Sequence, residues 1–242
     1  MTTFSDLGIP FPLYQAPIDT CPSYAGAQRC CVLGERRDHC FRLGSGDYLT
    51  MECAACGGAL YLHPTESPLR VRTCRHCGAP TPDPAAAHDD AFISYEALRA
   101  GYAVFTKDTD YGMVSWQELE EGWSHGVPRP APEGLRSRQS AGGWTQTQLP
   151  TDALFELTST PDFLTCQGAV WLFSGARPMI YVGEWRKADF VAHAPNGRDA
   201  KEFFLNVVRD ADDETWSYAD SVFVYVFKDQ VTDAYAAYYD LD

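Results

Sequence analysis

Four cysteines of this sequence stand in two pairs whose spacing suits a metal ion. Cys53 and Cys56 form one C-x2-C pair, Cys74 and Cys77 form another, and residues 57–73 separate the pairs. This spacing is typical of structural zinc sites, in which four thiolates surround Zn²⁺ as a tetrahedron. Glycine follows each pair, which lets the backbone turn back toward the sulfur atoms. We therefore expect a bound Zn²⁺ rather than two disulfides or four free thiols.

A zinc ion held by four cysteines has no coordination position left for water or substrate, so we expect this zinc to be structural. Its binding would stabilise the fold, on the order of 10–16 kcal/mol by analogy with zinc-finger peptides. His76 lies inside the second pair and His88 lies shortly after it. Either histidine could replace a cysteine ligand, but a surface or supporting position is the simpler interpretation.

A second group of candidate metal ligands lies nearer the start of the chain. It consists of Cys30, Cys31, His39 and Cys40. Successive side chains of a strand point to opposite faces, so two adjacent cysteines are awkward joint ligands. A second zinc site at these residues stays open as an alternative.

The sequence gives little indication of catalysis. Cys166 with His125 or His193 could act as nucleophile and base, although a cysteine before Gln-Gly is more often a packed or loop thiol. Glu184 could face an aromatic pocket, but an ion-paired carboxylate is the plainer interpretation. No P-loop, G-x-G-x-x-G or H-E-x-x-H motif occurs, so the signatures of nucleotide-dependent enzymes and metalloproteases are missing. We predict no catalytic residue.

The charge of the chain bears on its partners. The formal net charge is −14, and sequence-independent binding of nucleic acid needs clustered Lys and Arg. Residues 205–242 contain nine acidic and two basic side chains, which indicates either a solvated face or a docking surface for a basic partner. Arg70, Arg72 and Arg75 around the second cysteine pair keep a nucleic-acid-binding zinc ribbon as an alternative.

The sequence also predicts where the protein resides. The first basic residue is Arg29, and no apolar run approaches the length of a membrane span, so neither a signal peptide nor a membrane segment is indicated. C-x2-C pairs without an export signal are typical of a reducing compartment. We expect a cytoplasmic protein without a membrane partner.

The pattern of apolar residues predicts an α+β fold, with a zinc-ribbon-like cysteine-rich part before a compact α+β unit that holds an antiparallel sheet. The expected divisions are a proline-rich arm and ribbon over 1–88, a helical connector and loop over 89–143, and the α+β unit over 144–242. Within these, the arm covers 1–28 and a loop covers 126–143. The sequence predicts helices from Asp89, over 115–122, 152–157 and 199–209, and strands over 169–173, 179–185, 221–228 and 234–239.

The order of several segments resembles the CbrC family of small bacterial cytoplasmic proteins, which are associated by name with colicin tolerance. The resemblance rests on residues 106–116 (TKDTDYGMVSW), 124–128 (SHGVP), 181–185 (YVGEW) and 225–227 (YVF). No single motif is specific, but the collinear order spans most of the chain. Members typically carry a further C-x2-C pair near the N-terminus and another after the Tyr-Val-Phe strand. Here no cysteine follows Phe227, so we expect no metal site at the C-terminus.

These observations lead to one main hypothesis and two alternatives. The main hypothesis is a non-enzymatic zinc-binding protein that protects against a protein toxin, as the resemblance implies, by binding a basic toxin domain through its acidic face. One alternative is a nucleic-acid-binding zinc-ribbon protein. The other is an enzyme of unknown reaction with a site between the ribbon and the second unit.

Overall fold

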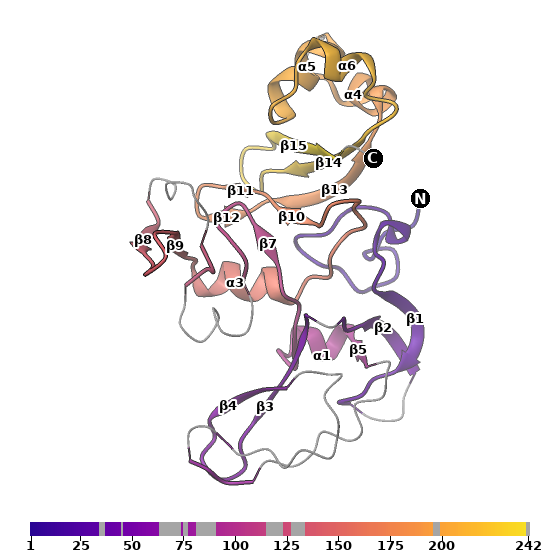
Figure 1. The fold of residues 1–242 in the computed structure, drawn as a ribbon. Coiled ribbons are helices and arrows are strands. Elements are labelled where there is room, and N and C mark those ends of the chain that lie inside the picture. Colours follow the sequence, from indigo (N-terminus) through magenta and orange to yellow (C-terminus); the bar gives the residue numbers. More distant parts are fainter. Residues whose placement is uncertain are drawn as a thin grey trace.

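The computed structural model describes residues 1–33, 37–44, 46–62, 74, 77–80, 91–114, 123–126, 134–195 and 199–240. In these residues, short helices combine with small sheets that are antiparallel except for one two-stranded pair. The predicted α+β class is therefore confirmed. Figure 1 shows helices α4, α5 and α6 at one end of the molecule, several sheets in the middle, and strands β3 and β4 reaching away at the opposite end.

The largest element of the C-terminal unit is an antiparallel sheet of three strands in the order β13-β14-β15. Its strands are β13 (Ile180–Trp185), β14 (Phe223–Lys228) and β15 (Tyr235–Asp240). The hairpin predicted over 221–228 and 234–239 is thus confirmed as β14 and β15. Alternate residues of β14 face opposite sides, as a strand requires: Val224 and Val226 join one core, and Tyr225 and Phe227 join another.

Three helices pack on the valine side of this sheet (Figure 1). They are α4 (Lys187–His193), α5 (Ala200–Val207) and α6 (Asp213–Ser217). The carboxylate of Asp199 accepts hydrogen bonds from two amides of the first turn of α5, which fixes its start. The helix predicted over 199–209 is therefore present, and it ends at Val207. Phe190, Phe203 and Phe204 fill the space between helices and sheet.

The aromatic side of the sheet contributes to the main core, which also contains the N-terminal residues. Phe163 stacks on Tyr181 with ring centroids 4.0 Å apart. Phe4 and Tyr14 are buried in the same core. Residues 1–28, which the sequence predicts as an extended proline-rich arm, thus contribute side chains to this core. The prolines of this segment are unfavourable for a long helix, and its elements are η1 (Ile18–Thr20) and β1 (Tyr24–Arg29). The apolar residues that precede η1 pack into the main core.

A second antiparallel sheet has the order β1-β2-β5, with β2 at Arg37–Arg42 and β5 at Phe92–Ser94. Helix α1 (Tyr95–Arg99) follows directly, and the Ser94 hydroxyl caps it by accepting from the Ala97 amide. The helix predicted from Asp89 therefore starts later than expected, because Phe92–Ser94 pairs with β2. The helix predicted over 115–122 lies outside the described residues.

Short elements fill the middle of the molecule. They are β7 (Asp108–Thr109), β8 (Arg136–Gln139), β9 (Thr145–Gln148), α3 (Thr151–Thr158), β10 (Val170–Trp171), β11 (Phe173–Ser174) and β12 (Arg177–Pro178). The helix predicted over 152–157 is confirmed as α3. Two other expectations were wrong. The loop over 126–143 contains β8, which pairs with β9, and the strand over 169–173 is split between a parallel partner, β7, and the β11–β12 hairpin.

The last sheet has the order β4-β3-β6, with β3 at Tyr48–Glu52, β4 at Ala59–Leu62 and β6 at Ala103–Val104. Strands β3 and β4 form a hairpin that extends away from the body (Figure 1). Leu49 at its base belongs to the main core. That core also contains residues from all three predicted divisions, 1–88, 89–143 and 144–242. The boundaries after residues 88 and 143 remain predictions. No helix among the described residues is long and apolar enough to cross a bilayer.

Candidate metal centre and interaction surfaces

The first cysteine pair forms the turn between β3 and β4. The Cys53 carbonyl oxygen accepts hydrogen bonds from the amides of Cys56, at 3.3 Å, and Gly57, at 2.7 Å. The Cys53 amide in turn donates to the Gly58 carbonyl oxygen at 2.9 Å. Gly57 has φ +70°, a left-handed conformation that favours glycine. The turn therefore depends on the glycine that the sequence places directly after Cys56.

The second pair repeats this arrangement. The Gly78 amide donates to the Cys74 carbonyl oxygen at 2.7 Å, and the Cys74 amide donates to Ala79 at 2.7 Å. Gly78 has φ +72°, close to the value at Gly57. Each C-x2-C pair is thus held by the same kind of turn, and the first and second cysteine of each pair project from corresponding positions.

The four sulfur atoms have the spacing that a tetrahedral metal ion needs. All four Sγ atoms lie within 4.8 Å of one another, with 3.8 Å from Cys53 to Cys77 and 3.7 Å from Cys56 to Cys74. A tetrahedron with Zn–S bonds of about 2.3 Å has sulfur atoms about 3.8 Å apart, whereas a disulfide needs about 2.05 Å. These cysteines can therefore hold a metal ion. They form the one such group found among the described residues.

The two cysteines of each pair differ in exposure. Cys53 is 3% exposed and Cys74 is 1% exposed, whereas Cys56 and Cys77 are exposed. Backbone amides of Gly58 and Ala79 donate to the two exposed sulfurs, Cys56 and Cys77, but the neighbouring thiols of the cluster and burial outweigh these bonds and raise the pKa of both cysteines above the ordinary value. His76, His88, Arg70, Arg72 and Arg75, which the sequence placed near this centre, lie outside the described residues.

The structure does not gather the second predicted set into a ligand group. His39 Nδ1 lies 2.6 Å from the Tyr24 hydroxyl, and the Cys40 sulfhydryl donates to the Gln28 carbonyl oxygen. Burial raises the pKa of Cys40 to about 12 and that of Cys31 to about 11. Burial also acts on Cys30, but there the Leu33 and Ser94 amides donate to the sulfur and bring its pKa below the ordinary value.

The residues considered for catalysis have structural contacts. The Glu184 carboxylate pairs with Arg186 at 2.6 Å. His193 stacks on Trp185 with ring centroids 4.3 Å apart, and its Nδ1 lies 2.9 Å from the Asp189 carbonyl oxygen. His125 donates its backbone amide to Met113, and Cys166 is exposed. The ion pair of Glu184 and the stacking and hydrogen bond of His193 give both side chains a structural role.

Sequence reasoning missed a buried cation. The Lys107 side chain is 0% exposed and its Nζ lies 2.7 Å from an Asp162 carboxylate oxygen, near the rings of Phe105 and Trp171. The local backbone pattern explains this placement. Phe105, Lys107 and Thr109 are buried, whereas Asp108 between them is exposed, so the lysine follows the period of two of an extended strand.

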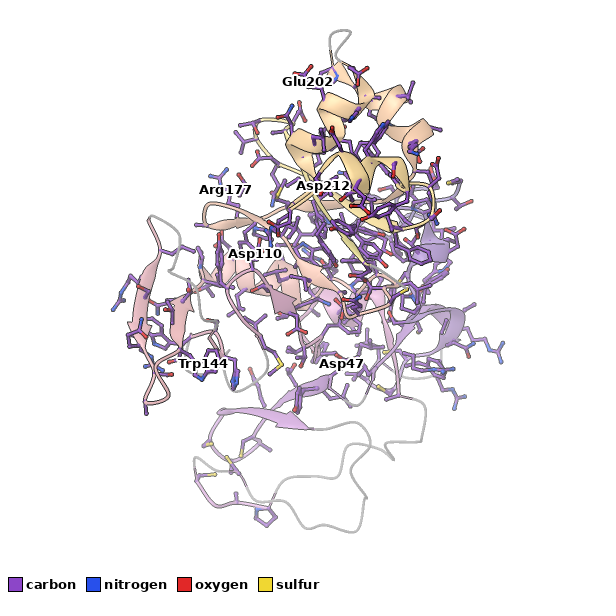
Figure 2. All side chains as sticks on the ribbon, turned by 45° about the horizontal axis from the view of Figure 1, so that its top comes forward. Asp47, Asp110, Trp144, Arg177, Glu202 and Asp212 are labelled. Carbon is purple, nitrogen blue, oxygen red and sulfur yellow. The ribbon has the colours of Figure 1, made fainter. Side chains whose placement is uncertain are left out.

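An acidic surface covers the helices of the C-terminal unit. We name it the acidic cap, and it comprises Asp199, Glu202, Asp212, Asp213, Glu214 and Asp220, all exposed. Figure 2 shows Glu202 and Asp212 on these helices. Lys201 pairs with Asp213 at 3.0 Å and Lys187 with Asp220 at 3.7 Å, which leaves an excess of negative charge. Of the nine acidic residues in 205–242, four belong to this cap, namely Asp212, Asp213, Glu214 and Asp220, whereas Asp229, Asp233 and Asp240 lie in β15 or in the turn that precedes it.

The β8–β9 hairpin differs in charge from the rest of this acidic chain. Residues 134–148 contain Arg136 and Arg138 and no carboxylate side chain. The guanidinium groups lie 5.9 Å and 4.5 Å from the centre of the Trp123 ring. Trp144, labelled on this hairpin in Figure 2, is 49% exposed. We call Trp123, Arg136, Arg138 and Trp144 the basic hairpin surface.

Fold and site together define an α+β protein with a four-cysteine cluster able to hold a metal ion. Comparison with known proteins adds no closer assignment, because no family model, no curated protein and no solved structure matches the chain.

Proposed function

We propose that this chain is a non-enzymatic zinc-binding protein in which Cys53, Cys56, Cys74 and Cys77 bind Zn²⁺. The ion closes a zinc ribbon formed by β3, β4 and the turn of the second cysteine pair. The observation that carries the proposal is the spacing of 3.7 Å and 3.8 Å between sulfur atoms, which fits Zn²⁺ with four thiolates. Four protein ligands leave no open position, so the ion acts on stability rather than on a substrate.

Metal analysis of the purified protein tests this step. We expect one zinc per chain and a loss of zinc in Cys74→Ser, because the buried Cys74 supplies one ligand. Cys166→Ser, which removes an exposed cysteine outside the cluster, is the matched control and should retain the metal. Purified protein without zinc that also fails to take it up after reduction would exclude the proposal.

The partner we propose is a basic protein that binds the acidic cap, and the resemblance to the CbrC family suggests a toxin domain. Charge complementarity supports the cap as the docking surface, because opposite charges speed association and favour one orientation. The Asp199 and Asp212 carboxylates also accept backbone hydrogen bonds at helix starts. At Asp212, the hydrogen bonds from Thr215 hold the pKa of the carboxyl below its ordinary value, so this member of the cap keeps its charge at neutral pH.

Binding to toxin domains encoded beside the gene tests the partner. We expect a complex that weakens as salt rises and that Glu214→Lys weakens by roughly fivefold or more at low salt. Asp152→Lys reverses a charge in the first turn of another helix, α3, and should leave affinity unchanged. If no such domain binds, and cells that produce the chain gain no protection, the partner assignment is wrong while the zinc site stands.

Nucleic-acid binding is the second candidate, and the basic hairpin surface favours it. Exposed aromatic rings stack on unpaired bases, and arginine contacts phosphate. A labelled oligothymidylate should then bind at low salt, and Trp144→Ala should weaken binding. Arg177→Ala, which removes an exposed arginine of β12, is the control. Absence of binding at low salt would exclude this candidate.

A further inference from the structure

The metal centre presents two of its four sulfur ligands to solvent and hides the other two. Cys53 and Cys74 are 3% and 1% exposed, while Cys56 and Cys77 are exposed. The difference follows from the repeated turn, in which the first cysteine lies inside and the second lies outside. A thiolate reacts with an oxidant only where the oxidant can reach it. The two outer sulfurs are therefore the reactive half of the centre.

We propose that Cys56 and Cys77 form an oxidation site, at which a hydroperoxide joins the two sulfurs and releases the metal. This inference rests on the proposed zinc site. The two Sγ atoms lie within 4.8 Å of each other, and a disulfide needs about 2.05 Å between sulfurs. Because both side chains lie at the surface, rotation about their Cα–Cβ bonds can close this gap with little change in the buried residues.

The chemistry is a two-electron oxidation of two thiolates. The sulfur of Cys56 or Cys77 attacks one peroxide oxygen, the O–O bond breaks, and hydroxide leaves, so that this sulfur becomes a sulfenic acid. The other outer thiolate then attacks the oxidised sulfur, an S–S bond forms, and a second hydroxide leaves. Two thiolates lose two electrons in total, and the peroxide gains them. Only Cys53 and Cys74 then remain as ligands, and because two thiolates hold the metal weakly, it is lost to solvent.

The buried pair is protected from the same reaction. Cys53 and Cys74 form a small apolar cluster of their own, and their sulfurs contact solvent far less than those of the outer pair. Cys166 is exposed as well, but it lies outside the cluster and its oxidation releases no metal. Cys21 is 5% exposed, and burial raises its pKa to about 11, so it serves as an internal standard for an unreactive thiol.

The experiment uses the zinc-loaded full chain with a Cys166→Ser background, which prevents disulfides between chains through that thiol. Hydrogen peroxide is added, zinc release is followed with a chromogenic chelator, and free thiols are alkylated at each time before peptide mapping. We expect a Cys56–Cys77 disulfide to appear at the same rate as zinc, with one zinc released for each disulfide. Cys21 should remain reduced, and dithiothreitol with added zinc should restore the loaded protein.

The outcomes separate this inference from the proposed function. A purified chain that holds no zinc and takes up none overturns the zinc site itself. A chain that holds zinc but loses it through a disulfide that contains Cys53 or Cys74 overturns the oxidation site and leaves the zinc site standing. Retention of zinc after peroxide has oxidised other cysteines would also overturn the oxidation site and leave the zinc site standing. No ligand substitution is needed, because mapping reads each cysteine of the loaded protein.

Discussion

Lys107 has a fully buried side chain, and its carboxylate partner, Asp162, has a side chain that is 39% exposed. Because of this difference in exposure, removal of Asp162 and removal of Lys107 should have different effects on stability. Removing the carboxylate leaves a charged ammonium in the core, which is costly, whereas replacing the lysine by an apolar residue of similar length leaves a carboxylate that can turn to water. The stability of the pair therefore depends mainly on which partner is removed.

We expect Asp162→Ala to lower the free energy of unfolding by about 3 kcal/mol and Lys107→Met to lower it by about 1 kcal/mol or less. Urea denaturation followed by tryptophan fluorescence measures both. The combined variant should be close in stability to Lys107→Met, because the carboxylate has no buried cation left to compensate. Equal losses for the two single variants would show that the lysine is not held as a buried charge.

Asp229 gives a prediction about pH. Hydrogen bonds from the Ser174 hydroxyl and from the amides of Thr232 and Val231 hold the pKa of the Asp229 carboxyl well below its usual range. The folded state thus favours the ionised form, so this stabilisation is fully present above the unfolded pKa of about 3.9 and is lost as pH falls toward the folded value.

In Asp229→Asn, we expect stability at pH 7 to fall by about 1 kcal/mol, because neutral hydrogen bonds replace charge-assisted ones. The difference from the wild-type chain should shrink as pH falls below about 4. Denaturant titrations at a series of pH values measure it. A difference that stays constant across this range would contradict the assignment of the carboxylate as the group that titrates.

At the scale of elements, glycine decides where two backbone segments can meet. Gly112 has φ +109°, and a Cβ at this position would lie 2.7 Å from the backbone nitrogen of Gly126. Gly168 has a nearly equal φ of +106° with nothing within 4 Å of the added atom. The two glycines therefore have nearly the same φ and differ in how closely another backbone segment approaches them.

We expect Gly168→Ala to cost about 1–2 kcal/mol, since alanine rarely adopts this φ, and Gly112→Ala to cost at least 1 kcal/mol more because backbone must move. Thermal unfolding of both variants measures the difference. Similar melting temperatures would mean that the segments around Gly112 and Gly126 are not in contact.

The elements also differ in how well the sequence predicts them. The β14–β15 hairpin and helices α3 and α5 were predictable because strand alternation and turn residues act locally. The cysteine pairs were predictable because zinc fixes both residue type and spacing. The start of α1 was not, since Phe92–Ser94 pairs with β2, which lies 50 residues earlier in the chain. The burial of Phe4 and Lys107 likewise depends on contacts between distant segments.

At the scale of the whole molecule, the cysteine cluster is separate from the two aromatic cores. Cys53 and Cys74 form a cluster of their own, while the main core and the core beneath the helices contain neither residue. The β3–β4 hairpin contacts the rest of the protein through its base, where Tyr48 and Leu49 pair with β6. Figure 1 shows this hairpin projecting from the rest of the fold.

This separation predicts that metal removal unfolds the β3–β4 hairpin and leaves the two aromatic cores folded. After chelation, amide hydrogen exchange in β4 and in the end of β3 next to Cys53 should rise to the rate of an unstructured chain, because beyond the pairing of Tyr48 and Leu49 with β6 only a two-stranded hairpin remains. The C-terminal sheet β13-β14-β15 should keep its protection, since its aromatic packing contains no metal ligand. Hydrogen exchange read by mass spectrometry compares the loaded and stripped protein. Equal loss of protection in β14 would mean that the centre and the two cores fold as a single cooperative unit.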